Sequence, residues 1–258
     1  KVTPFLKSDL MYWGQFGITP SILKYYDVRR VDRAWINDDL WYLNNTFDPC
    51  YRYKEKDKFK LYRPFADKRV KFRTNYFGGL LEGYTQLPNK GKNLIITKGT
   101  KDVMTLHSLG INAVAVRSEN TPMSENAYEL LKHRFENLYL WFDADEAGLN
   151  GAKKMSEKFN IPFLEHDGSL GKDPSDVYKN HGKEKLLEIN PGLNSDLKNN
   201  IQSLIGQKVN IENEVTATFL AITNLRKIFK FHSFLGYTAT PNANLLINTF
   251  NNFFVFIN

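Results

Sequence analysis

The chain contains a single cysteine, Cys50, among its 258 residues. One cysteine excludes an intramolecular disulfide framework and a zinc site built from cysteines, and it favours a reducing compartment, which we expect to be the cytoplasm. No apolar run reaches the length of about 18 residues that a membrane helix needs, and the N-terminal sequence has no signal-peptide pattern. We therefore expect no membrane partner.

Two kinds of motif are also missing. No Gly-x-x-x-x-Gly-Lys-Ser/Thr sequence occurs, which excludes a P-loop motor from this chain. The histidines His107, His133 and His166 stand apart from any Cys or His at ligand spacing. We expect them to be core or surface residues rather than metal ligands.

The positive charge is concentrated in one stretch, residues 51–75. This stretch has ten Lys and Arg residues against three acids, a balance of 10 − 3 = +7, which equals the net charge of the whole chain. A polyanion is the expected partner, since the aromatic residues between these charges suit base stacking beside phosphate contacts. A strand pair with an aromatic core face and a lysine-rich solvated face would explain the same alternation.

The pattern of apolar residues divides the chain into three parts. Residues 1–92 predict a basic α+β subdomain, with a helix at 20–26 and strands at 35–43 and 58–63. Residues 93–185 alternate between strands and helices, which indicates an α/β domain with a doubly wound, mainly parallel sheet. Its expected strands are 93–97, 113–116, 138–142 and 162–166, and its expected helices are 101–109, 124–135, 147–159 and 175–180. Residues 186–258 have no assigned role, although residues 214–229 read as helical.

The third expected strand of the α/β part delivers two carboxylates, Asp143 and Asp145, into a loop that ends in Ala147-Gly148. Ligands of open α/β sheets bind beyond the carboxyl ends of the strands, and alternate residues point to the same side. Two neighbouring acids repel unless a cation lies between them, so this loop is a candidate metal site. The alternative is a solvated turn whose acid caps the following helix.

Three segments carry a family resemblance. They are Thr97-Lys98-Gly99 with Asp102, Asp143-Ala-Asp145-Glu-Ala-Gly148, and Gly171-Lys-Asp173-Pro-Ser-Asp176. In order and spacing, residues 93–182 resemble the Toprim fold of DnaG-type primases, phage primase-helicases, topoisomerases and some nucleases. Upstream segments around Phe16-Gly-Ile-Thr19, residues 60–65 with Lys71-Phe72, and residues 83–88 look like the basic N-terminal subdomain of phage-type primases. The resemblance then covers most of residues 12–182.

The resemblance implies a DNA primase core that makes short RNA primers by metal-dependent nucleotidyl transfer, in phage DNA replication. Its implied cofactor is Mg²⁺ or Mn²⁺, held by Asp143 and Asp145 and completed by Asp173 and Asp176 from the facing loop. Asp102 would orient this site without touching the metal. Implied partners are a single-stranded DNA template, ribonucleoside triphosphates and a separate replicative helicase.

One position departs from the family pattern. Toprim proteins carry a glutamate where this chain has Lys98, and a lysine cannot ligate Mg²⁺. In the interpretation we favour, Glu119 supplies the missing carboxylate while Lys98 contacts a nucleotide phosphate, so that both join the acids as catalytic residues. In the other, the site is weakened and the chain only binds nucleic acid.

Basic side chains near this site are candidates for triphosphate and template contacts. They are Lys60, Arg63, Lys68, Lys71, Arg73 and Lys101. Lys101 is expected in the first turn of a helix, where phosphate binding is favoured, although a solvated charge explains it as well. A Toprim nuclease and a non-catalytic single-strand-binding module remain alternative functions. A topoisomerase is the least favoured, because it needs an active-site tyrosine in a separate large domain.

Overall fold

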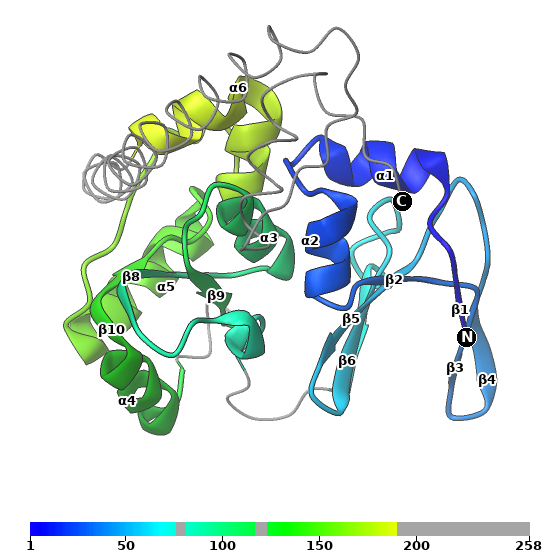
Figure 1. Cartoon of the computed structure of the whole chain (residues 1–258), viewed down its shortest axis with the longest axis horizontal. Coiled ribbons are helices and arrows are strands. Elements are labelled where there is room, and N and C mark those ends of the chain that lie inside the picture. The colour runs from blue at the N-terminus through cyan, green and yellow to red at the C-terminus, as the bar shows by residue number, and fades with distance from the viewer. Residues whose placement is uncertain (76–80, 117–122, 190–258) are drawn as a thin grey trace, which may run out of the picture. The chain divides into compact units, whose positions relative to one another are not determined.

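The computed structural model describes residues 1–75, 81–116 and 123–189 (Figure 1). The predicted ligand Glu119 and the C-terminal segment from residue 190, including the helix expected at 214–229, lie outside these described residues. Of the helices within them, none combines the length and hydrophobicity needed to cross a bilayer.

The first part of the chain is built on antiparallel strands. Its elements are β1 (Val2–Thr3), α1 (Lys7–Gly14), α2 (Pro20–Tyr25), β2 (Arg29–Val31), β3 (Arg33–Ile36), β4 (Asp39–Leu43), β5 (Tyr51–Glu55), β6 (Lys58–Tyr62) and β7 (Phe72–Thr74). Five of these strands form one sheet in the order β1-β2-β5-β6-β7, while β3 and β4 form a separate hairpin. The predicted helix at 20–26 is α2, which begins after Thr19 because the Thr19 side chain accepts a hydrogen bond from the Ile22 N–H.

The single strand predicted at 35–43 is wrong, because the chain turns back between β3 and β4. Asn37 and Asp38 at the turn have φ values of 51° and 69°. Asn and Asp tolerate this left-handed conformation better than other residues with side chains, and two such residues form a tight hairpin turn. Trp35 then pairs with Leu40 on the returning strand.

The second part of the chain alternates strands and helices, as predicted. Its elements are η1 (Tyr84–Gln86), β8 (Gly91–Thr97), α3 (Thr100–Ser108), β9 (Ala113–Ala115), α4 (Glu125–Arg134), β10 (Phe135–Leu140), α5 (Glu146–Phe159) and α6 (Pro174–Glu188). The strands β10-β8-β9 form a parallel sheet in that order, which confirms the α/β class. The fourth predicted strand, 162–166, is reduced to a single bridge between Phe163 and Leu140. Pro162 has no N–H to donate, which limits pairing there.

The two faces of the parallel sheet are covered by different helices. Along β8, Ile95 packs into one buried cluster with Val103 of α3 and Val177 of α6. Its neighbour Ile96 packs into another cluster, with Leu131 of α4, Met155 of α5 and other residues. Burial on both faces explains why the strand reads as a continuous apolar run.

The first of these clusters continues into the antiparallel part of the chain. Trp13 of α1, Tyr51 of β5 and Tyr62 of β6 belong to the same buried cluster as Ile95. The hydroxyls of Tyr12 and Tyr62 are hydrogen-bonded at 2.8 Å beside it. One apolar core thus spans the predicted domain boundary at residue 92, and this boundary stays a prediction.

A buried ion pair anchors α1 to β2. The side chains of Asp9 and Arg30 are each only 1% exposed, and Arg30 Nη1 donates to Asp9 Oδ1. The same oxygen accepts a 2.8 Å hydrogen bond from the Tyr51 hydroxyl, while Asp9 Oδ2 accepts one from the Leu6 N–H. A buried charge is tolerated only when it is paired and hydrogen-bonded, and Asp9 meets this condition.

Candidate active site

The candidate site lies at the carboxyl ends of β8 and β10, which are neighbours in the parallel sheet. Lys98 follows β8 directly, and Asp143 follows β10 after two buried residues. Because parallel strands end at the same edge, the two side chains meet: Lys98 Nζ lies 2.9 Å from Asp143 Oδ2. The residue that replaces the family glutamate therefore forms an ion pair with the first predicted ligand.

A second lysine joins this cluster from the loop before α6. Lys172 Nζ lies 3.1 Å from Asp143 Oδ2 and 2.9 Å from Asp145 Oδ2. The loop is held in place because the Ala144 N–H donates a 2.8 Å hydrogen bond to the Lys172 carbonyl. We call Asp143 and Asp145 the acid pair, and Lys98 and Lys172 the lysine pair.

Lys172 was not among the residues predicted for the site. The only feature of the sequence that could have indicated a role for Lys172 is its position beside Asp173. Its contact with the acid pair could not be predicted, because this contact depends on how the loop folds over the strand ends. The hydrogen bond from Lys172, followed by that from the Gly148 N–H, lowers the pKa of Asp145 below its usual value. The hydrogen bond to Asp145, and then that to Asp143, raise the pKa of Lys172, so Asp145 and Lys172 both stay charged at neutral pH.

Two of the predicted metal ligands also begin helices. Asp145 Oδ1 accepts a 2.9 Å hydrogen bond from the Gly148 N–H at the start of α5. Asp173 Oδ1 accepts a 2.8 Å hydrogen bond from the Asp176 N–H at the start of α6. Both carboxylates therefore cap helices, as the alternative for the Asp145 loop predicted, and one oxygen of each accepts a hydrogen bond from the backbone.

The four predicted ligands fall into two groups rather than one. Around Lys101, the Nζ lies 3.4 Å from Asp176 Oδ1 and 3.8 Å from Asp173 Oδ2. Asp143 and Asp145 instead surround Lys172. Within the described residues, no three Asp, Glu, His or Cys side chains converge in a way that could hold a metal ion.

This donor set fits one kind of metal binding. Mg²⁺ keeps several waters and is held by one or two carboxylates together with substrate phosphates, rather than by a cage of protein ligands. The acid pair supplies two such carboxylates at the sheet edge, with Asp145 44% exposed. The acid pair therefore fits a metal ion that is also bound by a substrate phosphate. The described residues offer too few converging ligands to hold a metal ion without that phosphate.

Asp102, predicted to orient the site, lies buried beneath the Lys101 group. Its Oδ1 accepts a 3.2 Å hydrogen bond from the Ser175 N–H, which joins α3 to α6. Burial, and then the negative charge of Asp173, raise the pKa of Asp102 well above 3.8. Burial alone would also raise the pKa of Asp173, but the Lys101 charge and hydrogen bonds from Ser175, Asp176 and Asp102 lower it below its usual value. Folding thus favours the protonated form of Asp102 and the charged form of Asp173.

We expect Asp102→Asn to become progressively more stable than the parent as the pH rises. A carboxyl whose pKa is raised by folding stabilises the protein below its unfolded pKa of 3.8, and that stabilisation is lost as the pH rises through the folded pKa. An amide carries no such penalty and can still accept from Ser175 and donate to Asp173. Urea denaturation at pH 5 and pH 8 would measure the difference, with exposed Glu157→Gln as the control. An equal free-energy difference at both pH values would contradict the buried, protonated state.

Three of the basic residues predicted to bind nucleotide or template are engaged inside the protein. Lys60 Nζ lies 2.9 Å from Oε1 of the buried Glu82, which also accepts a hydrogen bond from Thr100. Arg63 Nε donates to Asp48 at 3.0 Å. Lys101 is held by Asp173 and Asp176 as described above. Sequence reasoning missed Glu82, since nothing near it in the chain indicates its partner on β6.

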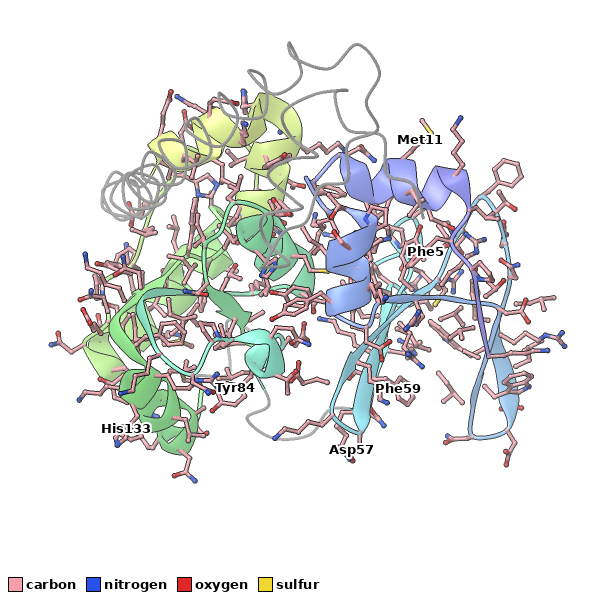
Figure 2. All side chains as sticks on the ribbon, in the orientation of Figure 1. Phe5, Met11, Asp57, Phe59, Tyr84 and His133 are labelled. Atoms are coloured by element: carbon pink, nitrogen blue, oxygen red, sulfur yellow. The ribbon has the colours of Figure 1, made fainter. Side chains whose placement is uncertain are left out.

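The other three lie at the surface around β7. Lys68 is exposed, Lys71 Nζ lies 6.0 Å from the centre of the Tyr62 ring, and the Arg73 guanidinium lies 5.7 Å from that of Trp41. Phe59, labelled in Figure 2, and Phe72 are exposed on the neighbouring strands β6 and β7. Positive charge and partly exposed aromatic rings thus occur on both faces of the β6–β7 pair, although the Phe72 ring is stacked on that of Tyr62.

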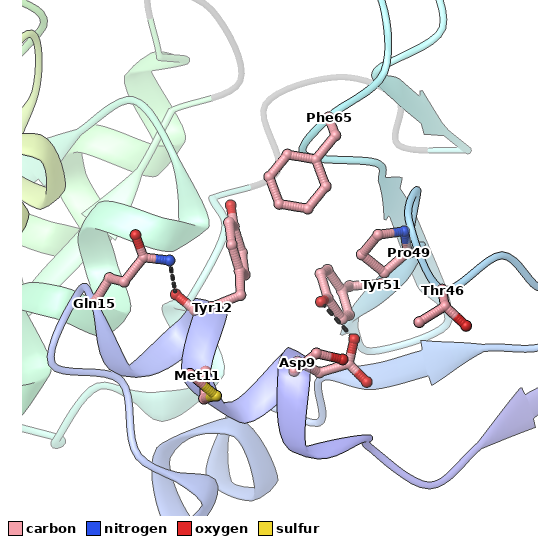
Figure 3. A pocket seen from close by; sticks show the side chains of 9 residues that line it. Asp9, Met11, Tyr12, Gln15, Thr46, Pro49, Tyr51 and Phe65 are labelled. Atoms are coloured by element: carbon pink, nitrogen blue, oxygen red, sulfur yellow. Dashed lines mark hydrogen bonds between the residues drawn. The ribbon is translucent and has the colours of Figure 1, made fainter.

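A pocket of about 370 Å³ opens between α1 and the segment before β5. Figure 3 shows the rings of Tyr12 and Phe65 on one side of it and Thr46 and Pro49 on the other. Tyr12 and Phe65 meet edge to face, with ring centres 5.5 Å apart. Three of the nine lining residues are aromatic, namely Tyr12, Tyr51 and Phe65, and the acid in the wall, Asp9, is already paired with Arg30.

His166 supports the site without facing it. Its Nδ1 accepts a 3.0 Å hydrogen bond from the Trp141 indole, so Nε2 carries the proton and donates to the Gly171 carbonyl at 3.0 Å. These bonds tie the strand that leads to Asp143 to the loop that carries Lys172.

Comparisons with known proteins agree with this geometry. A family model described as Toprim-like matches residues 95–178. A DNA primase of Borreliella burgdorferi is 28% identical over 160 residues, which are 58% of this chain and 30% of that protein. A UPF0292 protein of Methanocaldococcus jannaschii is 33% identical over 88 residues, which are 34% of this chain and 69% of that protein. The chain therefore spans less than a third of the length of the primase it matches.

The fold is shared with solved primase structures. The catalytic domain of a DnaG primase bound to single-stranded DNA superposes with a TM-score of 0.55 at 16% identity, covering 72% of this chain and 74% of that one. The matched part includes more than the Toprim-like residues, since these make up only a third of the chain.

Proposed function

Because the chain belongs to the Toprim-domain proteins related to DnaG-type DNA primases, we propose that it is the core of a primase that makes short RNA primers on single-stranded DNA. The observation that supports this most directly is the acid pair that follows β10 at the edge of the parallel sheet, with Lys98 from the end of β8 and Lys172 within 3.1 Å. Such a cluster offers carboxylates to a metal and ammonium groups to a phosphate at one edge of the sheet.

In the proposed reaction, a 3′-hydroxyl group loses its proton to water, and its oxygen bonds to the α-phosphorus of an incoming ribonucleoside triphosphate. The bond between that phosphorus and the bridging oxygen breaks, and pyrophosphate leaves. Mg²⁺ or Mn²⁺, held by Asp143 and Asp145, would stabilise charge on the attacking and leaving oxygens. Lys98 and Lys172 would bind the triphosphate oxygens and orient them. Asp173 and Asp176 would act on Lys101 and α6 rather than on the metal.

Template binding is assigned to the surface around β7. Lys68, Lys71 and Arg73 can contact a phosphate backbone, and the exposed ring of Phe59 can stack on a base. The pocket lined by Tyr12, Tyr51 and Phe65 among other residues offers a second place for a base. The solved DnaG domain bound to single-stranded DNA supports this choice of partner. A phage replication system and a separate helicase remain part of the proposal.

The test is primer synthesis by the whole chain. The protein would be incubated with Mg²⁺ or Mn²⁺, labelled ribonucleoside triphosphates and single-stranded DNA, beside Asp143→Asn and the exposed control Glu157→Gln. We expect short RNA from the parent and the control, and a loss of about a hundredfold or more in Asp143→Asn, which removes a charge from the reacting centre. Cleavage of DNA without triphosphates would instead identify a nuclease.

One observation favours a second candidate, a module that binds single-stranded DNA without catalysis. Lys98 occupies the position of the family glutamate and neutralises Asp143. If the parent binds single-stranded DNA but makes no RNA, and Lys98→Glu makes RNA, the module is the better description. Its DNA binding would weaken steeply with salt and would not need a metal.

A further inference from the structure

The four charged groups at the strand ends neutralise one another. Two carboxylates face two ammonium groups, so the formal charge of the cluster is zero. All three ion pairs are 2.9–3.1 Å long, and Lys172 touches both acids at once. The lysine pair thus contacts Asp143 Oδ2 and Asp145 Oδ2, oxygens that a cation bound to both acids would compete for.

Neither half of a metal-triphosphate complex suits this cluster alone. A free divalent cation would have to displace Lys172 and Lys98 and then remain close to their positive charges, which repel it. A free triphosphate would approach the lysines while the carboxylates still lie beside them. A cation and a triphosphate that arrive together can replace every ion pair that they break. The cation takes the place of the ammonium groups beside the carboxylates, and the phosphates take the place of the carboxylates beside the lysines.

We propose that Lys98 and Lys172 keep free divalent cations off the acid pair and admit them only together with a triphosphate, which then binds the lysines. This inference rests on the proposed function, because it names how that same site takes its nucleotide. The chain would differ in this respect from a site with a glutamate at position 98, where a third carboxylate would attract the cation by itself.

Replacing the ion pairs between the acid pair and the lysine pair needs only side-chain movement. The Lys172 side chain is 54% exposed and that of Asp145 is 44% exposed, so their ion pair lies at the solvent boundary. The Lys98 side chain is 25% exposed, while Asp143 beneath it is 8% exposed. The backbone around Lys172 is fixed by the Ala144 hydrogen bond and by His166 at Gly171. The lysine can therefore turn toward a phosphate while the loop stays in place.

The test measures binding of each component separately to the whole chain by calorimetry. The probes are Mn²⁺ alone, and a β,γ-methylene ribonucleoside triphosphate in EDTA. Lys98→Met removes one member of the lysine pair, and Lys153→Met makes the same charge change at an exposed position of α5. We expect Lys98→Met to bind Mn²⁺ about tenfold more tightly and the triphosphate about tenfold more weakly, as for the loss of one close charge pair. The control should change neither constant.

The inference requires that Lys98→Met change the affinities for Mn²⁺ and for the triphosphate in opposite directions. If Mn²⁺ binding is unchanged in Lys98→Met, or if the triphosphate binds as in the parent, the inference is overturned. Tight binding of Mn²⁺ alone by the parent would overturn it as well. Lys172→Met, which should show the same pair of changes, replaces Lys98→Met if circular dichroism shows that Lys98→Met does not fold.

This experiment uses no template and no turnover. A chain that makes no primers can still show the opposite changes, in which case the inference stands and the proposed primase activity fails. A chain that makes primers without these changes would keep the proposed function and lose the inference.

Discussion

Replacing Arg30 with methionine is expected to reduce the free energy of unfolding by about 3–5 kcal/mol, the usual cost of removing one partner from a buried ion pair. Asp9 would keep its hydrogen bonds from Tyr51 and from the Leu6 N–H, but its charge would lose the guanidinium that compensates it. Arg30 Nη2 also donates to Asn44 Oδ1 at 2.8 Å, so the change also detaches the segment after β4. A loss of this size is a large part of the stability of an ordinary domain.

The neighbouring Arg29 provides the matched control. Arg29 pairs with Asp27 at 2.9 Å, but the two side chains are 48% and 38% exposed. Exposed pairs of this kind contribute about 0–1 kcal/mol, so Arg29→Met should unfold at nearly the parental denaturant concentration. Guanidinium denaturation of both variants would compare them directly.

A double variant tests the charge argument itself. If Asp9→Asn is added to Arg30→Met, the uncompensated charge disappears, and the combined loss should be smaller than the sum of the two single losses. Equal losses for Arg29→Met and Arg30→Met, or strict additivity in the double variant, would show that the buried pair is not what anchors α1 to β2.

Replacing Gly148 with alanine is expected to damage both the stability and the activity of the protein. A Cβ at this position would lie 2.2 Å from the Asp143 carbonyl oxygen and 2.9 Å from its carbonyl carbon. Backbone atoms cannot move aside as a flexible side chain can, so the start of α5 must shift away from the strand end. We expect a loss of about 1–3 kcal/mol in the free energy of unfolding, as for other overpacked sites.

The same shift should disturb the acid pair. Asp145 caps α5 through the Gly148 N–H, so moving this N–H displaces the Asp145 carboxylate from Lys172. Primer synthesis should therefore fall further than the loss of stability alone explains, even at temperatures where the variant is folded.

Gly14 provides the matched control for this substitution. A Cβ at Gly14, the last residue of α1, would meet nothing within 4 Å. Gly14→Ala should therefore leave primer synthesis unchanged and raise the free energy of unfolding by up to about 1 kcal/mol, because alanine loses less conformational entropy than glycine in a helix. Equal behaviour of Gly14→Ala and Gly148→Ala would show that the close approach at Asp143 has no consequence.

The regular part of the fold could be predicted from the sequence because its signals are local. The apolar runs that became β8 and β10 and the capping residues Ser124, Asp145 and Asp173 act within a few residues of their own position. The order of strands and helices then placed Lys98 and Asp143 at one edge of the sheet. The turn at Asn37-Asp38 also had a local signal, and the single strand predicted there was an error of interpretation.

The sequence by itself thus determined the α/β class, the starts of α3 to α6 to within a residue and the position of the acid pair, since each depends on spacing along the chain. Only the tertiary structure decided which charges are paired. Lys172 with Asp145, Lys60 with Glu82 and Arg30 with Asp9 are brought together by packing of segments that are far apart in the sequence. A charged residue has the same local pattern whether its partner is water, another side chain or a phosphate, and only the packed structure distinguishes them.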